Sequence, residues 1–331
     1  MREIGSEISH SIAYPTMGII LLGGLTDSTF RKPRHTSAGI TYTGVEEDMF
    51  AEVQLFASDR RIGLINGVEV SGSESRSPFV VLDRYRDSIL KKKGKIDSQL
   101  SFESWSRNIP SGSSDAAAAA FGYCISSILE NRVNIVDLEN DLRTISESVG
   151  RSLKGGLTLT HPGKEPWTEL LLPESSFENY EIVAFRFQEP RKPSDRIHEN
   201  IVGSPEYGKR IEETEQKGRQ LAEIAGSEDI EGIFDLAEKD TERYHRLIES
   251  VGVNVINPGM LALINNLKSK RGEFWNRYIV TGGSNVFTVI RSEDRAKALA
   301  LATDSECTTS ILRVAGPPVA VYDQVKKDFK G

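Results

Sequence analysis

The residues with the clearest chemical potential form a small-residue turn at 111–114, which reads Ser-Gly-Ser-Ser and precedes five consecutive alanines at 116–120. Alanines favour a helix, and the N-terminus of a helix presents free N–H groups and a positive dipole end to an anion. The hydroxyl groups of Ser111, Ser113 and Ser114 can donate to a phosphate or complete the coordination of a magnesium ion that it carries. The turn lacks the Gly-Lys-Ser/Thr of a Walker A loop, and a serine that only caps the helix is an equally good interpretation. Residues 111–114 are therefore candidate phosphate ligands, with helix capping as the alternative.

A second glycine cluster lies at 281–285, which reads Thr-Gly-Gly-Ser-Asn between two segments rich in β-branched residues. By itself this cluster is typical of a tight hairpin. Glycine-containing turns in both halves of the chain together favour a nucleotide-dependent transferase whose cleft lies between the halves.

Two other catalytic patterns do not occur in the sequence. The five histidines include no pair four residues apart, which excludes a zinc-binding H-E-x-x-H helix, and there is no G-x-S-x-G nucleophile elbow. His245 lies in a predicted helix, and we expect it to be structural. Arg151 follows another predicted helix, and interaction with the helix dipole alone would explain a cation there.

Composition narrows the class of protein. The 331 residues exceed a typical domain of ~150 residues, so two domains or one large α/β unit are expected. The 41 Lys+Arg and 48 Asp+Glu give a net charge of −7, which excludes a broad attraction to nucleic acid or to an acidic membrane. Cys124 and Cys307 lie in unrelated segments, and no apolar run approaches the ~18 residues of a membrane span. We expect a cytoplasmic protein without nucleic-acid or membrane partners.

The hydrophobic pattern predicts mixed helices and strands, with a boundary between a domain at 1–172 and a domain at 173–331. In the first half we expect strands at 19–22, 38–42, 100–105 and 156–160, and helices at 79–90, 115–129 and 135–149. In the second half we expect strands at 182–185, 277–281, 286–290 and 310–314, and helices at 206–225, 230–251, 260–270 and 293–302.

Three segments resemble a known family. Asn-Ile-Pro at 108–110, with the turn and the alanine-rich helix, resembles the phosphate-binding motif of the GHMP kinase superfamily. Arg-Ser-Leu-Lys-Gly-Gly at 151–156 resembles the Arg-Ser-Leu-x-Gly-Gly signature of the diphosphomevalonate decarboxylase family, and residues 281–286 occupy the place of its Asp-Ala-Gly-Pro-Asn-Ala segment. The order and spacing agree across nearly the whole chain. The resemblance implies an α+β GHMP kinase fold, with a ribosomal-protein-S5-like N-terminal domain and a ferredoxin-like C-terminal domain. It also implies ATP and Mg²⁺ in a site between the domains, and a homodimer.

Two departures from the family concern its charged groups. In the decarboxylases an Asp, a Lys and an Arg surround the 3-hydroxyl and the C1 carboxylate of the substrate. Here the Arg is retained as Arg151, whereas Thr281 stands at the Asp position and Leu21 at the Lys position. Threonine cannot act as a carboxylate base, and Leu21 removes a cation. The pattern is similar to the branch of this family that phosphorylates the tertiary 3-hydroxyl of mevalonate, in isoprenoid biosynthesis by a mevalonate pathway, and stops there.

A third departure concerns the other end of the substrate. The decarboxylases have a serine near the position of Glu147, facing the C5 diphosphate, whereas a carboxylate would repel a diphosphate and accept a hydrogen bond from a free 5-hydroxyl. Unphosphorylated mevalonate is therefore the expected substrate. Arg191 matches a substrate-binding arginine of the kinase branch, although an exposed loop cation is the alternative.

The resemblance thus implies a set of roles. The expected catalytic residues are Arg151 and Thr281, the expected substrate-binding residues are Leu21, Glu147, Arg191 and Ser111, and the expected phosphate-binding residues are Ser111, Gly112, Ser113 and Ser114. Metal ligands are not predicted.

Other functions remain possible on the same scaffold. They are decarboxylation of a mevalonate phosphate or diphosphate, phosphorylation of a different small alcohol, and a catalytically silent binding protein that kept the nucleotide cleft. The serine turn and Arg151 argue against the silent protein.

Overall fold

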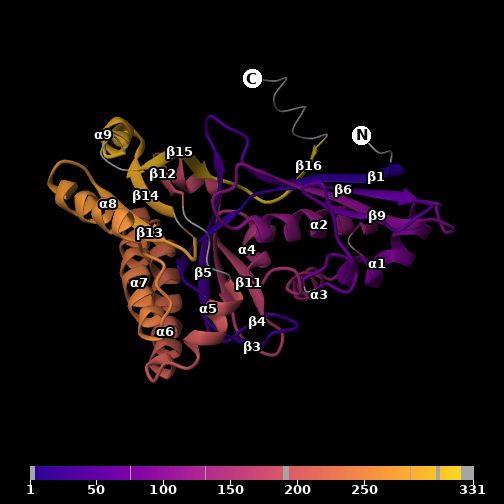
Figure 1. Cartoon of the computed structure of the whole chain (residues 1–331), viewed down its shortest axis with the longest axis horizontal. Coiled ribbons are helices and arrows are strands. Elements are labelled where there is room, and N and C mark those ends of the chain that lie inside the picture. Colours follow the sequence, from indigo (N-terminus) through magenta and orange to yellow (C-terminus); the bar gives the residue numbers. More distant parts are fainter. Residues whose placement is uncertain are drawn as a thin grey trace.

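The computed structural model describes residues 4–74, 76–130, 132–188, 194–283, 285–302 and 306–321, and the structural statements that follow concern these residues. A six-stranded sheet in the order β16-β1-β6-β9-β7-β8 carries helices α1 and α2 (Figure 1). Its strands are β1 (Ser6–Ala13), β6 (Phe50–Ser58), β7 (Gly63–Ile65), β8 (Val68–Glu69), β9 (Gln99–Arg107) and β16 (Val319–Ala320). The two helices on this sheet are α1 (Phe79–Lys92) and α2 (Ser113–Leu129), and the short helices α3 (Ile135–Leu142) and α4 (Val149–Lys154) follow them in the chain.

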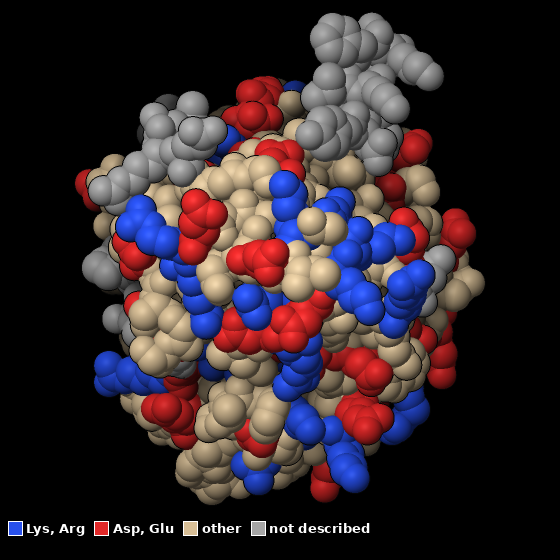
Figure 2. Space-filling model, turned by 90° about the vertical axis from the view of Figure 1, so that its right-hand side faces the viewer, with Lys and Arg blue, Asp and Glu red and all other residues tan. Residues whose placement is uncertain are grey.

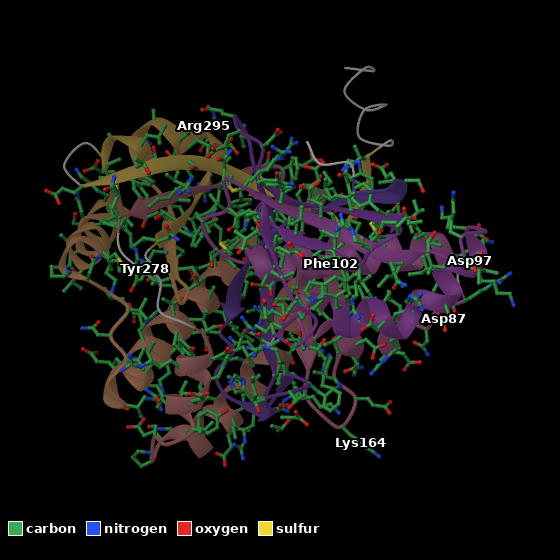
Figure 3. All side chains as sticks on the ribbon, turned by 45° about the vertical axis from the view of Figure 1, so that its right-hand side comes forward. Asp87, Asp97, Phe102, Lys164, Tyr278 and Arg295 are labelled. Carbon is green, nitrogen blue, oxygen red and sulfur yellow. The ribbon has the colours of Figure 1, made fainter. Side chains whose placement is uncertain are left out.

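Alternation along β6 explains how this layer forms. Its side chains are half-buried and buried in turn, as expected for a strand with one face on a core. The alanines of α2 let the helix lie close to that face, where Phe102 and Phe121 fill the core with their rings in edge contact. Figure 3 shows Phe102 inside the molecule, whereas Asp87, Asp97 and Lys164 lie on its outside.

A second sheet joins the two halves of the chain. Its order is β11-β10-β5-β15-β12-β14-β13, and β2 also pairs with β5. Leu312, Arg313 and Val314 of β15 pair with Gly44, Thr43 and Tyr42 of β5, so a strand from near the C-terminus lies beside one from the first third. The strands are β2 (Thr16–Ile20), β5 (Ser37–Gly44), β10 (Leu157–His161), β11 (Trp167–Leu172), β12 (Tyr180–Phe187), β13 (Asn276–Val280), β14 (Asn285–Arg291) and β15 (Cys307–Val314).

Helices cover this second sheet at the end of the molecule opposite α1 (Figure 1). They are α6 (Tyr207–Gly226), α7 (Ile230–Ser250), α8 (Pro258–Ser269) and α9 (Arg295–Ala300). The shorter α5 (Ser194–Ile201) packs against α7, and a small hairpin of β3 (Leu25–Asp27) and β4 (Lys32–Pro33) lies near α5. The face drawn in Figure 2 intersperses acidic and basic side chains. In the part of the chain that the structure describes, no helix is both long enough and apolar enough to cross a membrane.

Most predicted elements are confirmed within a few residues, and two are wrong. The helix predicted at 135–149 is two short helices, α3 and α4, joined by a connection that contains Glu147. The strand predicted at 19–22 ends at Ile20, and residues 21–24 have no regular secondary structure. The predicted domain boundary at 172–173 falls between β11 and a short 3₁₀ turn (Glu174–Phe177), and it stays a prediction.

Two buried histidines make the stability of this fold depend on pH. Burial lowers the pKa of His35 and of His245 to about 4. Below pH ~6.5 the unfolded chain binds protons that the folded chain does not bind, so stability falls as the pH drops towards 4. We expect each histidine to contribute about 1.4 kcal/mol per pH unit to this slope.

Replacing His245 isolates one of these contributions. Its Nε2 donates to the Val280 carbonyl at 2.8 Å, and glutamine can donate there without titrating. We expect His245→Gln to flatten the dependence of unfolding free energy on pH between 6 and 4.5 by about 1.4 kcal/mol per unit, measured by urea denaturation. Measurements at pH 8 give the effect of repacking alone. Parallel curves for the wild type and the variant would contradict the assignment.

Candidate active site

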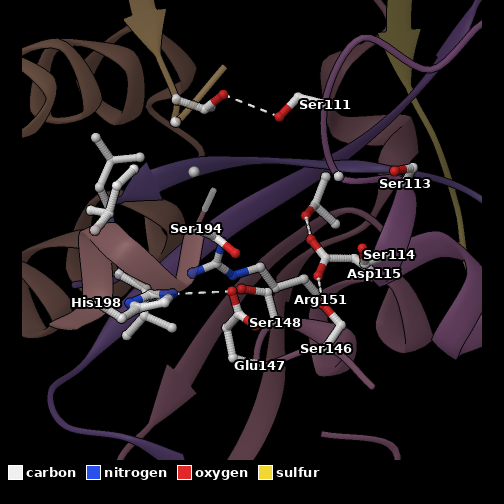
Figure 4. Close-up of a pocket in the computed structure, with 18 of the residues that line it drawn as sticks. Ser111, Ser113, Ser114, Asp115, Ser146, Glu147, Ser148, Arg151, Ser194 and His198 are labelled. Carbon is white, nitrogen blue, oxygen red and sulfur yellow. Dashed lines mark hydrogen bonds and ion pairs between the residues drawn. The ribbon is translucent and has the colours of Figure 1, made fainter. Parts of the chain in front are cut away.

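A cavity of about 380 Å³ lies beside the N-terminus of α2. It is bounded by the turn before α2, the end of β2, the connection between α3 and α4, the start of α5, and the loop between β13 and β14 (Figure 4). It brings together all of the sequence-predicted site residues that the structure describes, namely Leu21, Ser111, Gly112, Ser113, Ser114, Glu147, Arg151 and Thr281. Arg191 lies outside the described residues.

Backbone geometry makes the turn before α2 suited to an anion. Gly112 occupies the N-cap position with φ +77°, and no side chain caps the helix. The capping alternative from the sequence is therefore wrong, and the first N–H groups of α2 are left without a side-chain acceptor. The Tyr42 hydroxyl fixes the turn from behind, since it donates to the Ser111 carbonyl at 2.5 Å and accepts from the Ser111 N–H at 3.1 Å.

The two glycine clusters meet across the cavity. Ser111 Oγ lies 3.1 Å from Thr281 Oγ1, although 170 residues separate them (Figure 4). The Asn285 amide donates to the Pro110 carbonyl at 2.9 Å and ties the same two segments together. The hairpin interpretation of residues 281–285 is also correct, because β13 and β14 pair as antiparallel neighbours with Val280 opposite Val286. One loop thus serves as both hairpin and cavity lining.

The guanidinium of Arg151 is buried in this cavity and forms no salt bridge with the described residues. It is 5% exposed, and its Nε and Nη2 atoms have no hydrogen-bond partner among the described residues. Burial lowers the pKa of its guanidinium, and the carboxylates of Asp115 and Glu147 oppose that effect without bonding to it. Buried donors without acceptors are costly, so the arrangement indicates an anionic ligand. Figure 4 shows Arg151 between Asp115 and Glu147.

Asp115 is a site residue that sequence reasoning missed. It lies in the first turn of α2, where its carboxylate accepts hydrogen bonds from Thr16 Oγ1 at 2.6 Å and from the Ser146 hydroxyl. Burial raises its pKa, and the negative charge of Glu147 adds to this. An acidic residue in a first helical turn was the available signal, but it is common in helices without any site.

Glu147 is the centre of a second charged group. Its Oε2 accepts from Arg31 Nε at 2.8 Å and from Arg76 Nη2 at 3.0 Å, and its Oε1 accepts from His198 Nε2 at 3.1 Å. Burial alone would raise its pKa, but the hydrogen bond from His198 and the charges of Arg31 and Arg76 hold that pKa well below its ordinary value. Asp195 lies on the outer side, within 2.6 Å of Arg31. Arg31, Arg76 and His198 come from irregular segments or short elements, and no spacing in the sequence pointed to them.

Hydrogen bonding fixes the tautomer of His198. Its Nδ1 accepts from the Gly24 N–H at 3.1 Å, so its proton is on Nε2, where it faces Glu147. His198 thereby connects the end of the β2 segment to the Glu147 carboxylate. Among the described residues, no group of three or more His, Cys, Asp and Glu side chains could hold a metal ion.

The fold, with its glycine-capped turn before α2, defines a two-domain protein of the GHMP kinase type. A model of the diphosphomevalonate decarboxylase-like N-terminal domain matches residues 13–170, and a model of the mevalonate-3-kinase C-terminal domain matches residues 192–296. The chain belongs to the mevalonate-3-kinase family.

Individual relatives agree with this placement. The chain is 45% identical to the mevalonate-3-kinase of Picrophilus torridus over 93% of its own length and 96% of that protein. It is 43% identical to the mevalonate 3-kinase of Thermoplasma acidophilum over 95% and 96%. The crystal structure of the Thermoplasma acidophilum enzyme with mevalonate 3-phosphate and ADP superposes with a TM-score of 0.89 at 41% identity, covering 94% of this chain and 97% of that one. Mevalonate diphosphate decarboxylase from Staphylococcus aureus shares the fold, with a TM-score of 0.78 at 16% identity over 95% and 97%.

Proposed function

We propose that this protein transfers the γ-phosphoryl group of ATP to the 3-hydroxyl of (R)-mevalonate and releases mevalonate 3-phosphate and ADP without decarboxylation. The observation that carries the proposal is the unpaired Arg151 guanidinium, which shares one cavity with the uncapped turn before α2 and with Thr281. A carboxylate-bearing alcohol and a nucleotide phosphate together match these groups. The names of the two relatives above 40% identity support the same reaction.

The roles of the residues follow from their chemistry. The backbone and hydroxyl groups of Ser111, Gly112, Ser113 and Ser114 would bind the ATP phosphates at the N-terminus of α2. A magnesium ion carried by those phosphates supplies charge neutralisation when it is bound, and serine hydroxyls of this turn are the groups that could complete its coordination. Arg151 would bind the C1 carboxylate of mevalonate.

The chemical step needs little from the protein beyond placement. The 3-hydroxyl oxygen forms a bond to the γ-phosphorus while the bond from that phosphorus to the bridging oxygen breaks, and the hydroxyl proton leaves to a phosphoryl oxygen or to water. Thr281, beside Ser111, would orient the 3-hydroxyl for this attack. Phosphoryl transfer through a loose transition state tolerates the absence of a carboxylate base. Decarboxylation also requires phosphate to leave C3 while positive charge develops there, and a site with Leu21 and Thr281 is poorly arranged to assist that.

Glu147 is proposed to select a free 5-hydroxyl. Its Oε1 accepts one hydrogen bond, from His198, and so retains capacity for a second donor. Arg31 and Arg76 offset its negative charge, so exclusion of a C5 diphosphate rests on the hydrogen bond to a hydroxyl more than on the simple repulsion expected from the sequence.

We expect Glu147→Gln to raise KM for mevalonate about tenfold and to change kcat less, because uniform binding of the 5-hydroxyl is weakened. Steady-state kinetics with mevalonate varied at saturating ATP measures this. Asp195→Asn is the control, since Asp195 contacts the same two arginines but its side chain is 47% exposed and lies outside the cavity lining. Equal effects of the two substitutions would contradict a contact between Glu147 and substrate.

The product of the reaction tests the proposed function directly. Purified protein is incubated with ATP, Mg²⁺ and (R)-mevalonate, ADP release is followed, and the product is identified by phosphorus and carbon NMR. A stable phosphate on the C3 oxygen without carbon dioxide supports the proposal. Carbon dioxide release, a C5 phosphate, or turnover only with phosphorylated mevalonates would overturn it, and ligand binding without ADP release would indicate a silent protein.

We also infer a cytoplasmic protein, as expected from the composition of the sequence, and a homodimer, which the family resemblance implies. Light scattering after size-exclusion chromatography tests the dimer against the 36.7 kDa chain.

A further inference from the structure

Residues 21–24 line or adjoin the active-site cavity without belonging to a strand or helix. They follow β2, whose pairing with β5 ends at Ile20. Their backbone is nevertheless almost completely hydrogen-bonded, and most of its partners are side chains. These partners are Asp240 for Leu21 N, Arg210 for Leu21 O, Tyr244 for Leu22 O, His35 for Gly23 N, Tyr207 for Gly23 O and His198 for Gly24 N.

A buried ion pair provides the first of these contacts. Asp240 Oδ2 accepts from the Leu21 N–H at 2.8 Å, and Arg210 Nη2 donates to the Leu21 carbonyl at 2.7 Å. Both side chains are 0% exposed, and Arg210 Nη2 also donates to Asp240 Oδ2 at 2.8 Å. Lys217 donates to Asp240 Oδ1 at 2.7 Å, so the carboxylate satisfies two cations and one peptide group. Buried ion pairs contribute little net stability, which makes a positioning role for this one worth testing.

Two aromatic hydroxyls and two imidazoles hold the rest of the segment. Tyr207 donates to the Gly23 carbonyl at 2.5 Å, and Tyr244 donates to the Leu22 carbonyl at 3.2 Å. His35 donates from Nδ1 to the Thr36 carbonyl, which leaves its Nε2 free to accept from the Gly23 N–H at 3.1 Å. Except for His35, the side chains that hold segment 21–24 come from α5, α6 and α7.

The glycines allow these helices to approach. A Cβ on Gly24 would collide with the Tyr207 hydroxyl oxygen, and one on Gly23 would lie 2.6 Å from Ile201 Cδ1. The Leu21 side chain in turn lies over Gly18, whose Cβ would be 2.6 Å from Leu21 Cδ2. The backbone of residues 21–24, the helices that carry Ile201 and Tyr207, and the Leu21 side chain therefore pack closely together at the cavity.

We propose that Asp240, Arg210 and Tyr207 are positioning residues that hold Leu21 and Leu22 as a rigid wall of the mevalonate subsite. The strand ends before the wall, so the backbone groups of the wall have no strand partner. Without these side chains those groups would need water as a hydrogen-bond partner, and that water would enter the subsite. The inference rests on the proposed function for the identity of the substrate. The hydrogen bonds from these side chains to residues 21–24, which we call the clamp, do not depend on the identity of the substrate, because they can be observed in the ligand-free protein.

The test compares two variants with a matched control. Asp240→Asn removes the charge that satisfies Arg210, and Tyr207→Phe removes one donor while leaving the ion pair intact in case the first variant fails to fold. Tyr278→Phe is the control, because Tyr278 is similarly buried and donates to Glu242 at 3.0 Å, but its hydroxyl forms no hydrogen bond with the described residues of segment 21–24.

Two measurements are made on each protein. Hydrogen exchange reports the protection of the Leu21, Gly23 and Gly24 amides, and steady-state kinetics reports KM for mevalonate and for ATP separately. We expect Tyr207→Phe to speed exchange in this segment and to raise KM for mevalonate about tenfold, with KM for ATP and kcat within about twofold. Tyr278→Phe should change neither the exchange nor the kinetics.

The outcomes distinguish a failure of the proposed clamp from a failure of the proposed function. Faster exchange with unchanged KM in both variants would overturn the positioning role and leave a structural one. Unchanged exchange in Tyr207→Phe would overturn the clamp, as would equal kinetic effects of Tyr278→Phe. If the wild type makes no mevalonate 3-phosphate, the proposed function fails, while the exchange data still decide whether the clamp exists.

Discussion

Replacing Arg151 by alanine is expected to lower kcat/KM for mevalonate by about a thousandfold or more, without lowering the free energy of unfolding of the ligand-free protein by a comparable amount. The guanidinium is buried without an ion pair or hydrogen bond from its Nε and Nη2, so it costs the empty protein desolvation energy. The nearby charges of Asp115 and Glu147 offset part of that cost, and a bound anion would offset the rest. Activity and stability should therefore respond in opposite directions to the loss of this charge.

Arg151→Met sharpens the experiment. The arginine stem lies over Gly39 of β5, where a Cβ would be 2.6 Å from Arg151 Cδ, and methionine keeps most of that packing while removing the charge. We expect its unfolding free energy, measured by urea denaturation, to equal or exceed that of the wild type. Near-normal turnover in either variant would contradict the carboxylate-binding role, and a large loss of stability in Arg151→Met would show that the charge is structural.

Replacing Gly112 by alanine is expected to raise KM for ATP at least about tenfold and to destabilise the protein by about 1–3 kcal/mol. Gly112 has φ +77°, and a Cβ there would lie 2.5 Å from the Thr16 carbonyl oxygen and 2.6 Å from its nitrogen. These are backbone atoms of β2, which pairs with β5, so they cannot move aside cheaply. The turn itself must shift, and the N–H groups of α2 would lose their arrangement around the phosphates.

Kinetics with ATP varied at saturating mevalonate measures this effect, and KM for mevalonate should change less. Gly226→Ala is the matched control, because a Cβ on Gly226 would have no atom within 4 Å apart from its chain neighbours and the backbone of its own helix, and the residue has no positive φ. If Gly112→Ala binds ATP normally, the anion-binding role of the turn is wrong.

Local composition predicted the helix after the serine turn well, whereas the phosphate-binding role of the turn stays a prediction. Five alanines after a run of small residues leave a close-packed helix as the favoured structure, and α2 confirms it from Ser113 to Leu129. The helix predicted at 135–149 failed for a physical reason. Leu142, Ile145 and Val149 are all buried at near-helical spacing, but the chain turns between them, and Arg143 holds the turn by donating to the Glu147 carbonyl and to Glu139. Hydrophobic periodicity cannot distinguish such a buried turn from a continuous helix.

The surroundings of Glu147 could not be predicted at all. Arg31 and Arg76 lie 116 and 71 residues from it, in segments without any hydrophobic period, and both have positive φ angles of 49° and 64°. Only the folded chain brings such residues together. The same holds for Asp240 and Leu21, whose contact spans 219 residues. The meeting of Ser111 with Thr281 was expected, both from the joint interpretation of the two glycine-containing turns and from the family resemblance.

The pairing of β15 with β5, and of β16 with β1, has a consequence for biosynthesis. Neither sheet has all of its described strands until residues 307–320 have left the ribosome, although β1 and β5 are among the first to emerge. During translation the edges of β5 and β1 are therefore open templates for strands of other nascent chains. Chaperone demand and inclusion-body formation in overexpressing cells should thus depend on how fast the message is translated between the codons for β5 and those for β16.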